Sequence, residues 1–258
     1  MRRGRLAWGA LVLIGVAGLG LLRRYRANQW VTPYDLADRS AEEVAQLGAP
    51  LGAKVVDAAG LRGLLRAPTE GHRWLIFWAG NTSTYFAEAV ASVRGLELPA
   101  EIGVLIVAPP GFDSPGMPTP ERVEGDARGV VDWLRAQHGA REIVTMGFSM
   151  GTFSALAAAQ KDVRAVVLMG ATTRFDTGPR SWLVHFRRPV QYGLPAVAPK
   201  VSAVVLQGEH DEPGQGPAVA TWLGAKLVTL PGLTHEETPR DAHALQLAGQ
   251  FIRSALQD

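Results

Sequence analysis

A serine between two glycines lies at the centre of the stretch with the clearest chemical potential. Gly147, Ser149 and Gly151 form a Gly-x-Ser-x-Gly pattern. The apolar run before it, over 142–146, predicts a short buried strand, and the Ala-rich run after it, over 152–160, predicts a helix. A serine on so tight a turn is strained and exposed, and the glycines remove Cβ atoms that would collide as strand and helix close together. The pattern predicts a nucleophile at Ser149; the alternative is a Gly/Ser turn used only for packing.

A serine nucleophile needs an imidazole to take its proton and a carboxylate to orient that imidazole. Of the six histidines, His235 is the one that follows a late strand, predicted over 226–230. Three acids within four residues follow another apolar run, over 203–207. We select Asp211 among them as the carboxylate, with Glu209 as its main rival. A solvated loop histidine and a solvated acidic turn are the plain alternatives.

The elements that must position these residues alternate between strands and helices. Apolar runs predict strands over 53–57, 61–66, 74–79, 102–108, 142–146, 165–169, 203–207 and 226–230. Periodic patterns predict helices over 84–93, 122–137, 152–160, 217–223 and 241–256. Ala59-Gly60 joins the first two strands as a hairpin. This alternation predicts an α/β fold with a mostly parallel sheet and helices on both faces, and a site at the carboxyl ends of the strands.

Length and composition restrict the kinds of site that the chain can build. A chain of 258 residues suits one α/β domain, and the absence of cysteine excludes disulfides, thiolate metal sites and a cysteine nucleophile. Six arginines within the first 26 residues raise the isoelectric point; without them, 20 basic residues face 24 acidic ones. We therefore exclude nucleic acid as a partner. With no metal-ligand cluster or nucleotide-binding loop in the sequence, we expect no cofactor and no bound metal.

The N-terminal region carries a candidate membrane anchor. Leu6 to Leu22 is a run of 17 uncharged, mostly apolar residues between two arginine clusters. As a helix it would be about 25 Å long, just short of a hydrocarbon core. A cleaved signal peptide is the alternative, but the arginines directly after the run favour an uncleaved anchor. We expect an anchor over 1–26, a linker with a short helix around 40–47 over 27–52, and a catalytic domain over 53–258 on the non-cytoplasmic side of the membrane.

The chain order of Ser149, Asp211 and His235 is that of the α/β-hydrolases. The segments that match that superfamily are Gly-Phe-Ser-Met-Gly at 147–151, Gly-Glu-His-Asp-Glu-Pro at 208–213 and Pro-Gly-Leu-Thr-His at 231–235. Within it, the chain resembles the single-pass membrane-anchored serine hydrolases, the group that contains acylglycerol lipases and protein depalmitoylases. The resemblance implies an α/β-hydrolase fold with a short or minimal cap. It also implies a lipase-like serine esterase that cleaves an ester, thioester or amide of a small or lipid-like acyl substrate through an acyl-enzyme.

The resemblance further implies an oxyanion hole made by the backbone N–H groups of Met150 and Asn81. Two loops of that group can be compared with this sequence. The group's Tyr-Gly-x-Ser-x-Gly loop corresponds to 111–116 here, with Phe112 as its aromatic residue. Its His-Gly-Asn strand end reads Ala79-Gly80-Asn81, so the histidine that braces the oxyanion loop is missing.

That departure keeps two rival functions open. One is a non-catalytic domain of the same fold that binds or scaffolds at the membrane, which Ala79 favours and the intact Ser149, Asp211 and His235 oppose. The other is a different reaction on the same scaffold, such as peroxidase or lyase chemistry.

The segment over 171–199 lies where this fold often inserts a cap. It carries four aromatic residues and four arginines, Phe175, Trp182, Phe186, Tyr192, Arg174, Arg180, Arg187 and Arg188. Two interpretations remain open for it: a lid over an acyl pocket or membrane-facing rim, and a surface excursion with local packing.

Overall fold

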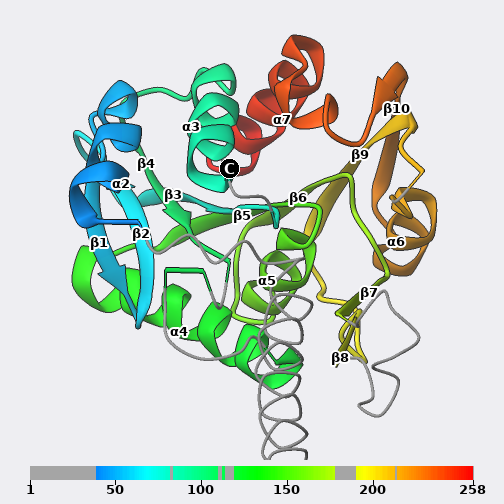
Figure 1. Ribbon diagram of the computed structural model, residues 1–258, viewed down its shortest axis with the longest axis horizontal. Coiled ribbons are helices and arrows are strands. Elements are labelled where there is room, and N and C mark those ends of the chain that lie inside the picture. The colour runs from blue at the N-terminus through cyan, green and yellow to red at the C-terminus, as the bar shows by residue number, and fades with distance from the viewer. Residues whose placement is uncertain are drawn as a thin grey trace, which may run out of the picture.

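In the computed structural model, residues 39–257 are described except for 82–83, 110–111, 114–118, 178–189 and 213. Eight strands of this part form one sheet through the middle of the molecule, in the order β1-β2-β4-β3-β5-β6-β9-β10 (Figure 1). They are β1 Lys54–Ala58, β2 Leu61–Arg66, β3 Arg73–Trp78, β4 Ile102–Val107, β5 Glu142–Phe148, β6 Ala165–Met169, β9 Ser202–His210 and β10 Lys226–Thr234.

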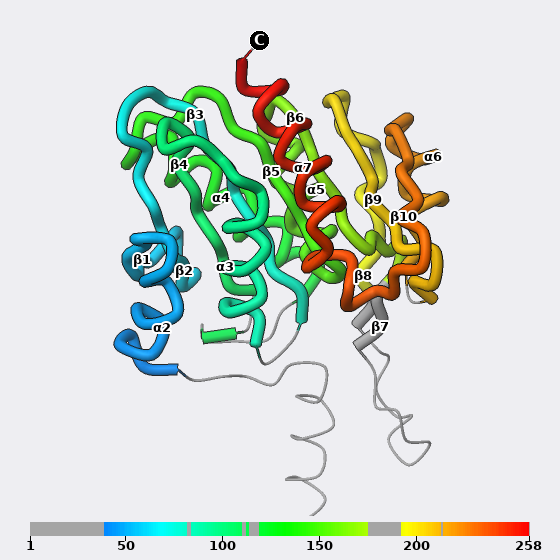
Figure 2. Tube along the Cα trace, turned by 90° about the horizontal axis from the view of Figure 1, so that it is seen from above, coloured from blue at the N-terminus to red at the C-terminus, as the bar shows by residue number. Residues whose placement is uncertain are grey.

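Helices cover both faces of the sheet (Figure 2). They are α2 Ala41–Gly48, α3 Tyr85–Gly95, α4 Pro120–His138, α5 Gly151–Ala158, α6 Gly216–Leu223 and α7 Ala242–Ala255, with short 3₁₀ turns η1 Ala49–Leu51 and η3 Thr238–Arg240. One hydrophobic core lies between the sheet and α2, α3 and α7, and a second lies between the sheet and α4, α5 and α6. The two cores bury both sides of the central strands, which explains why β3 and β4 are continuous apolar runs.

The strand pairings agree with the predicted, mostly parallel sheet. β4, β3, β5, β6, β9 and β10 pair in parallel with their neighbours in that order, and β1 and β2 form the predicted antiparallel hairpin, which joins the sheet by antiparallel pairing of β2 with β4. The carboxyl ends of the parallel strands therefore meet along one edge. The mostly parallel α/β sheet with helices on both faces is confirmed.

The short helix expected around 40–47 is α2, and it begins at the capping box that Ser40 and Glu43 form. Its Val44 is completely buried in the core against the sheet. The packed domain therefore extends back to Arg39, into the range assigned to a linker. The expected anchor, Leu6 to Leu22, lies outside the described residues, and within the described part of the chain no helix is long and apolar enough to span a bilayer.

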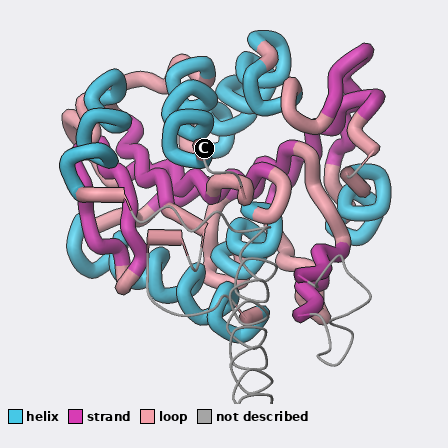
Figure 3. The backbone as a smooth tube through the Cα atoms, viewed as in Figure 1, coloured by secondary structure: helices cyan, strands magenta, loops and turns pink. Residues whose placement is uncertain are grey.

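A small second sheet, which the sequence analysis did not predict, lies apart from the main one (Figure 3). It pairs β7 Arg174–Thr177 with β8 Val190–Gly193 in antiparallel register. Both strands are four residues long and of mixed polarity, so neither gives an apolar run. Most of the aromatic and arginine residues singled out between 171 and 199 fall outside the described residues; Tyr192 is buried, with its ring 5.8 Å from that of Phe153.

Candidate active site

The turn between β5 and α5 holds Ser149 in a left-handed backbone conformation, with φ of +52°. A residue with a side chain adopts this conformation at a cost of about 1–3 kcal/mol, so the surrounding structure must enforce it. The Ser149 N–H donates to the carbonyl of Met169 on β6 (3.0 Å), and the Ser149 carbonyl accepts from the N–H of Thr152 (3.0 Å). The strained, partly exposed serine expected from the sequence is present in the structure.

The two glycines of the motif are required by the contact of helix and strands. A Cβ on Gly147 would lie 2.4 Å from the carbonyl oxygen of Gly151, and one on Gly151 would lie 2.1 Å from the carbonyl oxygen of Trp78 at the end of β3. No real Cβ approaches backbone so closely. The first turn of α5 therefore rests directly against the ends of β5 and β3, which fixes the position of Ser149.

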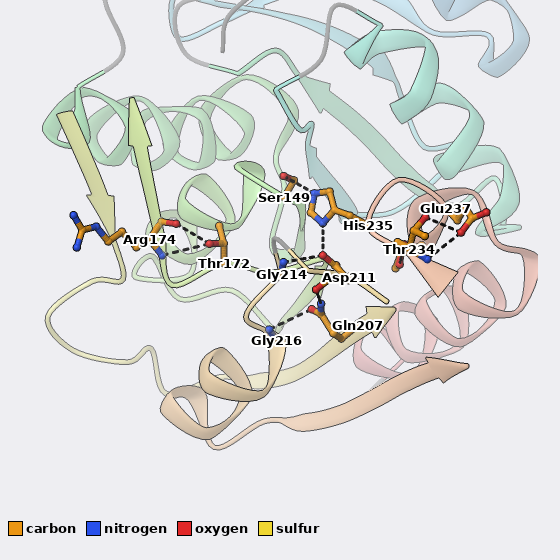
Figure 4. Close-up of polar contacts among 11 residues, drawn as sticks. Ser149, Thr172, Arg174, Gln207, Asp211, Gly214, Gly216, Thr234, His235 and Glu237 are labelled. Atoms are coloured by element: carbon orange, nitrogen blue, oxygen red, sulfur yellow. Dashed lines mark hydrogen bonds and ion pairs between the residues drawn. The ribbon is translucent and has the colours of Figure 1, made fainter. Parts of the chain in front are cut away.

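Ser149, His235 and Asp211 form a continuous hydrogen-bonded chain (Figure 4). His235 Nε2 lies 2.9 Å from Ser149 Oγ, and His235 Nδ1 lies 2.8 Å from Asp211 Oδ1. The three residues follow β5, β9 and β10, whose ends meet at the carboxyl edge of the sheet. The structure thus brings together the three residues selected from the sequence, although 86 positions separate Ser149 from His235.

The hydrogen-bond partners of His235 determine which of its two ring nitrogens carries the hydrogen. The Asp211 side chain is fully buried, whereas 19% of the His235 side chain is exposed. The Asp211 carboxylate can only accept hydrogen bonds, so the neutral imidazole carries its hydrogen on Nδ1 and donates it to Asp211. The lone pair on Nε2 then faces the Ser149 hydroxyl. This tautomer, assigned from the hydrogen-bond partners, is the one able to accept a proton from Ser149.

Glu209, the rival for the carboxylate role, is placed elsewhere. Its exposed carboxylate accepts a hydrogen bond from the backbone N–H of Gly232 (2.9 Å). That contact joins the ends of β9 and β10 and supports the loop that carries His235. Asp211 is therefore the carboxylate that contacts the imidazole. Glu209 instead supports the backbone at Gly232, three residues before His235.

The His235 loop has further supports that the sequence analysis missed. Glu237 accepts hydrogen bonds from the backbone N–H (2.9 Å) and the hydroxyl (2.6 Å) of Thr234, and these bonds lower the pKa of the Glu237 carboxyl. The Thr238 hydroxyl donates to the Thr234 carbonyl (2.8 Å). The Phe148 ring lies against the imidazole, with centroids 5.0 Å apart. The polar residues Thr234, Glu237 and Thr238 belong to no periodic sequence pattern, so only their spacing from His235 could have suggested their role.

The expected oxyanion residues, Asn81 and Met150, lie at the ends of the adjacent strands β3 and β5. Asn81 is partly exposed, and Met150 is the N-cap residue of α5. A Cβ on Gly80 would lie 2.9 Å from Phe148 Cδ1, so glycine permits the close approach of this loop to the elbow. The backbone of both residues is thus placed at the same edge as Ser149.

A buried ionic cluster lies on the loop after β4. The Asp113 side chain is fully buried, accepts from the Tyr85 hydroxyl and from the Arg39 N–H (2.8 Å), and lies 3.7 Å from Arg62 Nη1. Burial, and then the hydrogen bond to Asp113, raise the pKa of the Tyr85 hydroxyl well above its usual range. The backbone of Asp113 is left-handed, with φ of +49°. The cluster ties the incoming N-terminal segment to the loop that the resemblance had marked at 111–116.

Apolar side chains of α4 and α5 face the small second sheet. A small depression lies between these helices and β8, lined by Pro120, Val123, Glu124, Phe153, Tyr192, Gly193 and Pro195. Phe148, Met150 and Phe153 around the elbow belong to one buried cluster with Tyr192. Within the described residues, no three His, Asp or Glu side chains converge as metal ligands.

Comparison with known proteins agrees with this architecture. Residues 104–208 match the family model described as the alpha/beta hydrolase fold. No curated protein sequence matches the chain. Among solved structures, a lid-less a/b serine hydrolase from Xanthomonas campestris is 21% identical, with a TM-score of 0.55 over 80% of this chain and 95% of that one.

Two further structures are similar at the same level. The esterase domain of a Rhodothermus marinus protein is 18% identical, with a TM-score of 0.55 over 78% of this chain and 98% of that one. An alpha-beta serine hydrolase homologue from Coxiella burnetii is 14% identical, with a TM-score of 0.56 over 79% and 96%. These likenesses cover more than three quarters of the chain. The chain therefore has the α/β-hydrolase fold.

Proposed function

We propose that the protein is a serine hydrolase that cleaves an ester, thioester or amide through an acyl-enzyme. The observation that carries the proposal is the chain of hydrogen-bonding contacts from Ser149 through His235 to the buried Asp211, of 2.9 and 2.8 Å, on a strained strand-to-helix turn. Packing alone does not require a fully buried carboxylate aimed at an imidazole. Nor does it require a serine held at positive φ.

Each residue has a defined part in the proposed reaction. His235 Nε2 takes the hydroxyl proton as Ser149 Oγ attacks the carbonyl carbon, and Asp211 stabilises the imidazolium that forms. The backbone N–H groups of Met150 and Asn81 donate to the oxyanion. His235 then delivers the proton to the leaving group. Water, activated by the same imidazole, attacks the acyl-enzyme and releases the acid.

The surroundings of Ser149 favour an apolar acyl group. Phe148 and Met150 flank the serine, and the depression beside Phe153 and Tyr192 opens near the first turn of α5. The Xanthomonas and Rhodothermus structures are a serine hydrolase and an esterase domain, which supports carboxylic esters as the substrate class. The finer resemblance to membrane-anchored acylglycerol lipases is part of this proposal.

A fluorophosphonate probe tests the nucleophile directly, because it phosphonylates only an activated serine. We expect the native protein to be labelled and Ser149→Ala to be unlabelled. Ser154→Ala, which removes a serine hydroxyl from the helix that follows Ser149, serves as the matched control and should keep full labelling. Absence of labelling in the folded native protein would favour the non-catalytic binding domain instead.

We also propose that residues 6–22 anchor the protein in a membrane, with the catalytic domain on the non-cytoplasmic side. The sequence run and its flanking arginines support an anchor. The position of Arg39 adds a geometric argument, because its N–H is bound to Asp113 on the loop after β4, at the edge of the sheet where Ser149 lies. Only 16 residues separate Leu22 from Arg39. A chain this short would keep the site near lipid-like substrates.

The full-length protein is therefore expected to resist carbonate extraction from membranes. Leu13→Arg places a charge in the middle of the apolar run at a cost of about 2.5–3.5 kcal/mol, and should release protein into the soluble fraction. Leu13→Ala, which shortens the side chain without adding charge, is the control and should stay in the membrane. A soluble native protein whose N-terminus lies beyond Leu19 would show a cleaved signal peptide and refute the anchor.

A further inference from the structure

We propose that Gln207 is a positioning residue, whose carboxamide holds the Asp211 loop so that Asp211 meets His235. The inference rests on the proposed function, because it assigns a support to that same site. Gln207 lies on β9, one residue before Gly208, and only 5% of it is exposed. An uncharged polar side chain buried to this degree must find hydrogen-bond partners within the protein.

The carboxamide of Gln207 bonds to both ends of the loop over 211–216 (Figure 4). Its Nε2 donates to the backbone carbonyl of Asp211 (3.3 Å), and its Oε1 accepts from the backbone N–H of Gly216 (3.2 Å). A carbonyl needs a donor and an N–H needs an acceptor, so the two contacts also fix which way the amide points. One side chain thus spans the loop from the acid to the start of α6.

The loop lies directly on this side chain, and two glycines make that possible. A Cβ on Gly214 would lie 2.2 Å from Gln207 Nε2, and one on Gly216 would lie 2.5 Å from Gln207 Oε1. On its other side the loop is held by the N–H of Gln215, which donates to the carbonyl of Ala171 (2.6 Å). Gln215 Oε1 also accepts from the Thr173 N–H (3.0 Å), so the loop is held by Gln215 on one side and by Gln207 on the other.

The position of the loop determines the orientation of the carboxylate. Asp211 Oδ1 accepts from His235 Nδ1 (2.8 Å) and from the Gly214 N–H (2.7 Å). Its Oδ2 is buried and has no hydrogen-bond partner among the described residues. Besides His235, the group that orients the carboxylate is thus the N–H of Gly214, which belongs to the loop that Gln207 holds. If the loop moves, the hydrogen bond to the imidazole moves with it.

The test is Gln207→Met, which keeps the length of the side chain and removes both hydrogen bonds. We expect kcat for a p-nitrophenyl ester to fall about 10- to 100-fold with little change in KM, because the imidazole is less well oriented while the substrate-binding surface is unchanged. We also expect the low-field proton resonance of the hydrogen bond between His235 and Asp211 to shift or disappear. A role limited to stability would lower Tm without either change.

Thr145→Val is the matched control. It removes the buried hydrogen bond from Trp78 Nε1 to Thr145 Oγ1 (2.8 Å) within the same sheet, away from the loop. We expect it to lower Tm while leaving kcat and the low-field resonance at their native values. Gln207→Glu keeps the acceptor for Gly216 and loses the donor to Asp211, so it should also displace the resonance. It supplies the test if Gln207→Met does not fold.

Native kcat and an unchanged resonance in the folded Gln207 variant would overturn the proposal. The same losses in Thr145→Val would overturn it as well, since they would reflect general destabilisation. Failure of the proposed function has a different signature: Ser149→Ala would be as active as the native protein, or the native protein would lack activity. Even if the protein proves inactive, or active without Ser149, the low-field resonance of the hydrogen bond between His235 and Asp211 still shows whether Gln207 positions Asp211.

Discussion

Ser149→Ala is expected to reduce kcat for a short-chain p-nitrophenyl ester by several orders of magnitude, on the order of 10⁶ for the serine of such a triad. The variant should fold as the native protein does, because alanine removes only the hydroxyl oxygen. The φ of +52° at this position is held by backbone hydrogen bonds of residues 149 and 152, which alanine keeps. What is lost is the oxygen that His235 Nε2 contacts at 2.9 Å. Steady-state kinetics with active-site titration of the native protein measure the effect.

His235→Ala should cost about as much as Ser149→Ala, and the double variant should be no worse than either single one. The two side chains act as a unit, so once the proton acceptor is gone the hydroxyl contributes little. Ser154→Ala, on α5 directly after the Ser149 turn, should keep native turnover. A Ser149→Ala protein with turnover near that of the native protein, or losses that multiply in the double variant, would contradict the assignment of the nucleophile.

The central sheet could be predicted because burial on both faces leaves a strong signal. β3 and β4 are continuous apolar runs, and the predicted limits of most strands differ from the observed ones by one or two residues. β9 and β10 extend further than predicted, to His210 and Thr234, because their last residues are mostly exposed and form no apolar run, while pairing resumes at Thr234 and His210 after a register shift. The short strands β7 and β8 have no such run and were missed.

The three site residues could be selected from the sequence because each follows a strand, and parallel strands bring their carboxyl ends to one edge. The choice between Asp211 and Glu209 could not be made as firmly, because both follow the apolar run over 203–207 and they are only two residues apart. It depends on the turn of the loop, which Gln207 and Gly214 set through contacts that no periodicity reveals. The Asp113 cluster was missed for the same reason, because its partners come from distant elements.

Substitutions of Asp211 and Glu209 are expected to differ strongly in their effect on kcat. Asp211→Asn is expected to lower kcat by about 10⁴-fold, whereas Glu209→Gln should change it little. Glu209 is exposed, its partner within the described part of the chain is the Gly232 N–H, and a glutamine oxygen can accept the same bond. The same ester assay measures both variants, and each is the isosteric control for the other.

The structure shows why asparagine fails in either orientation. With its amide nitrogen toward His235, it faces two donors, the Gly214 N–H and the Nδ1 hydrogen, so the imidazole must move its hydrogen to Nε2 and can no longer accept the proton of Ser149. With its amide oxygen toward His235, the tautomer is kept, but the negative charge that stabilises the imidazolium is gone. The NH₂ group then occupies the place of Oδ2, which is buried with no hydrogen-bond partner among the described residues. A mild effect of Asp211→Asn together with a severe effect of Glu209→Gln would transfer the role to Glu209.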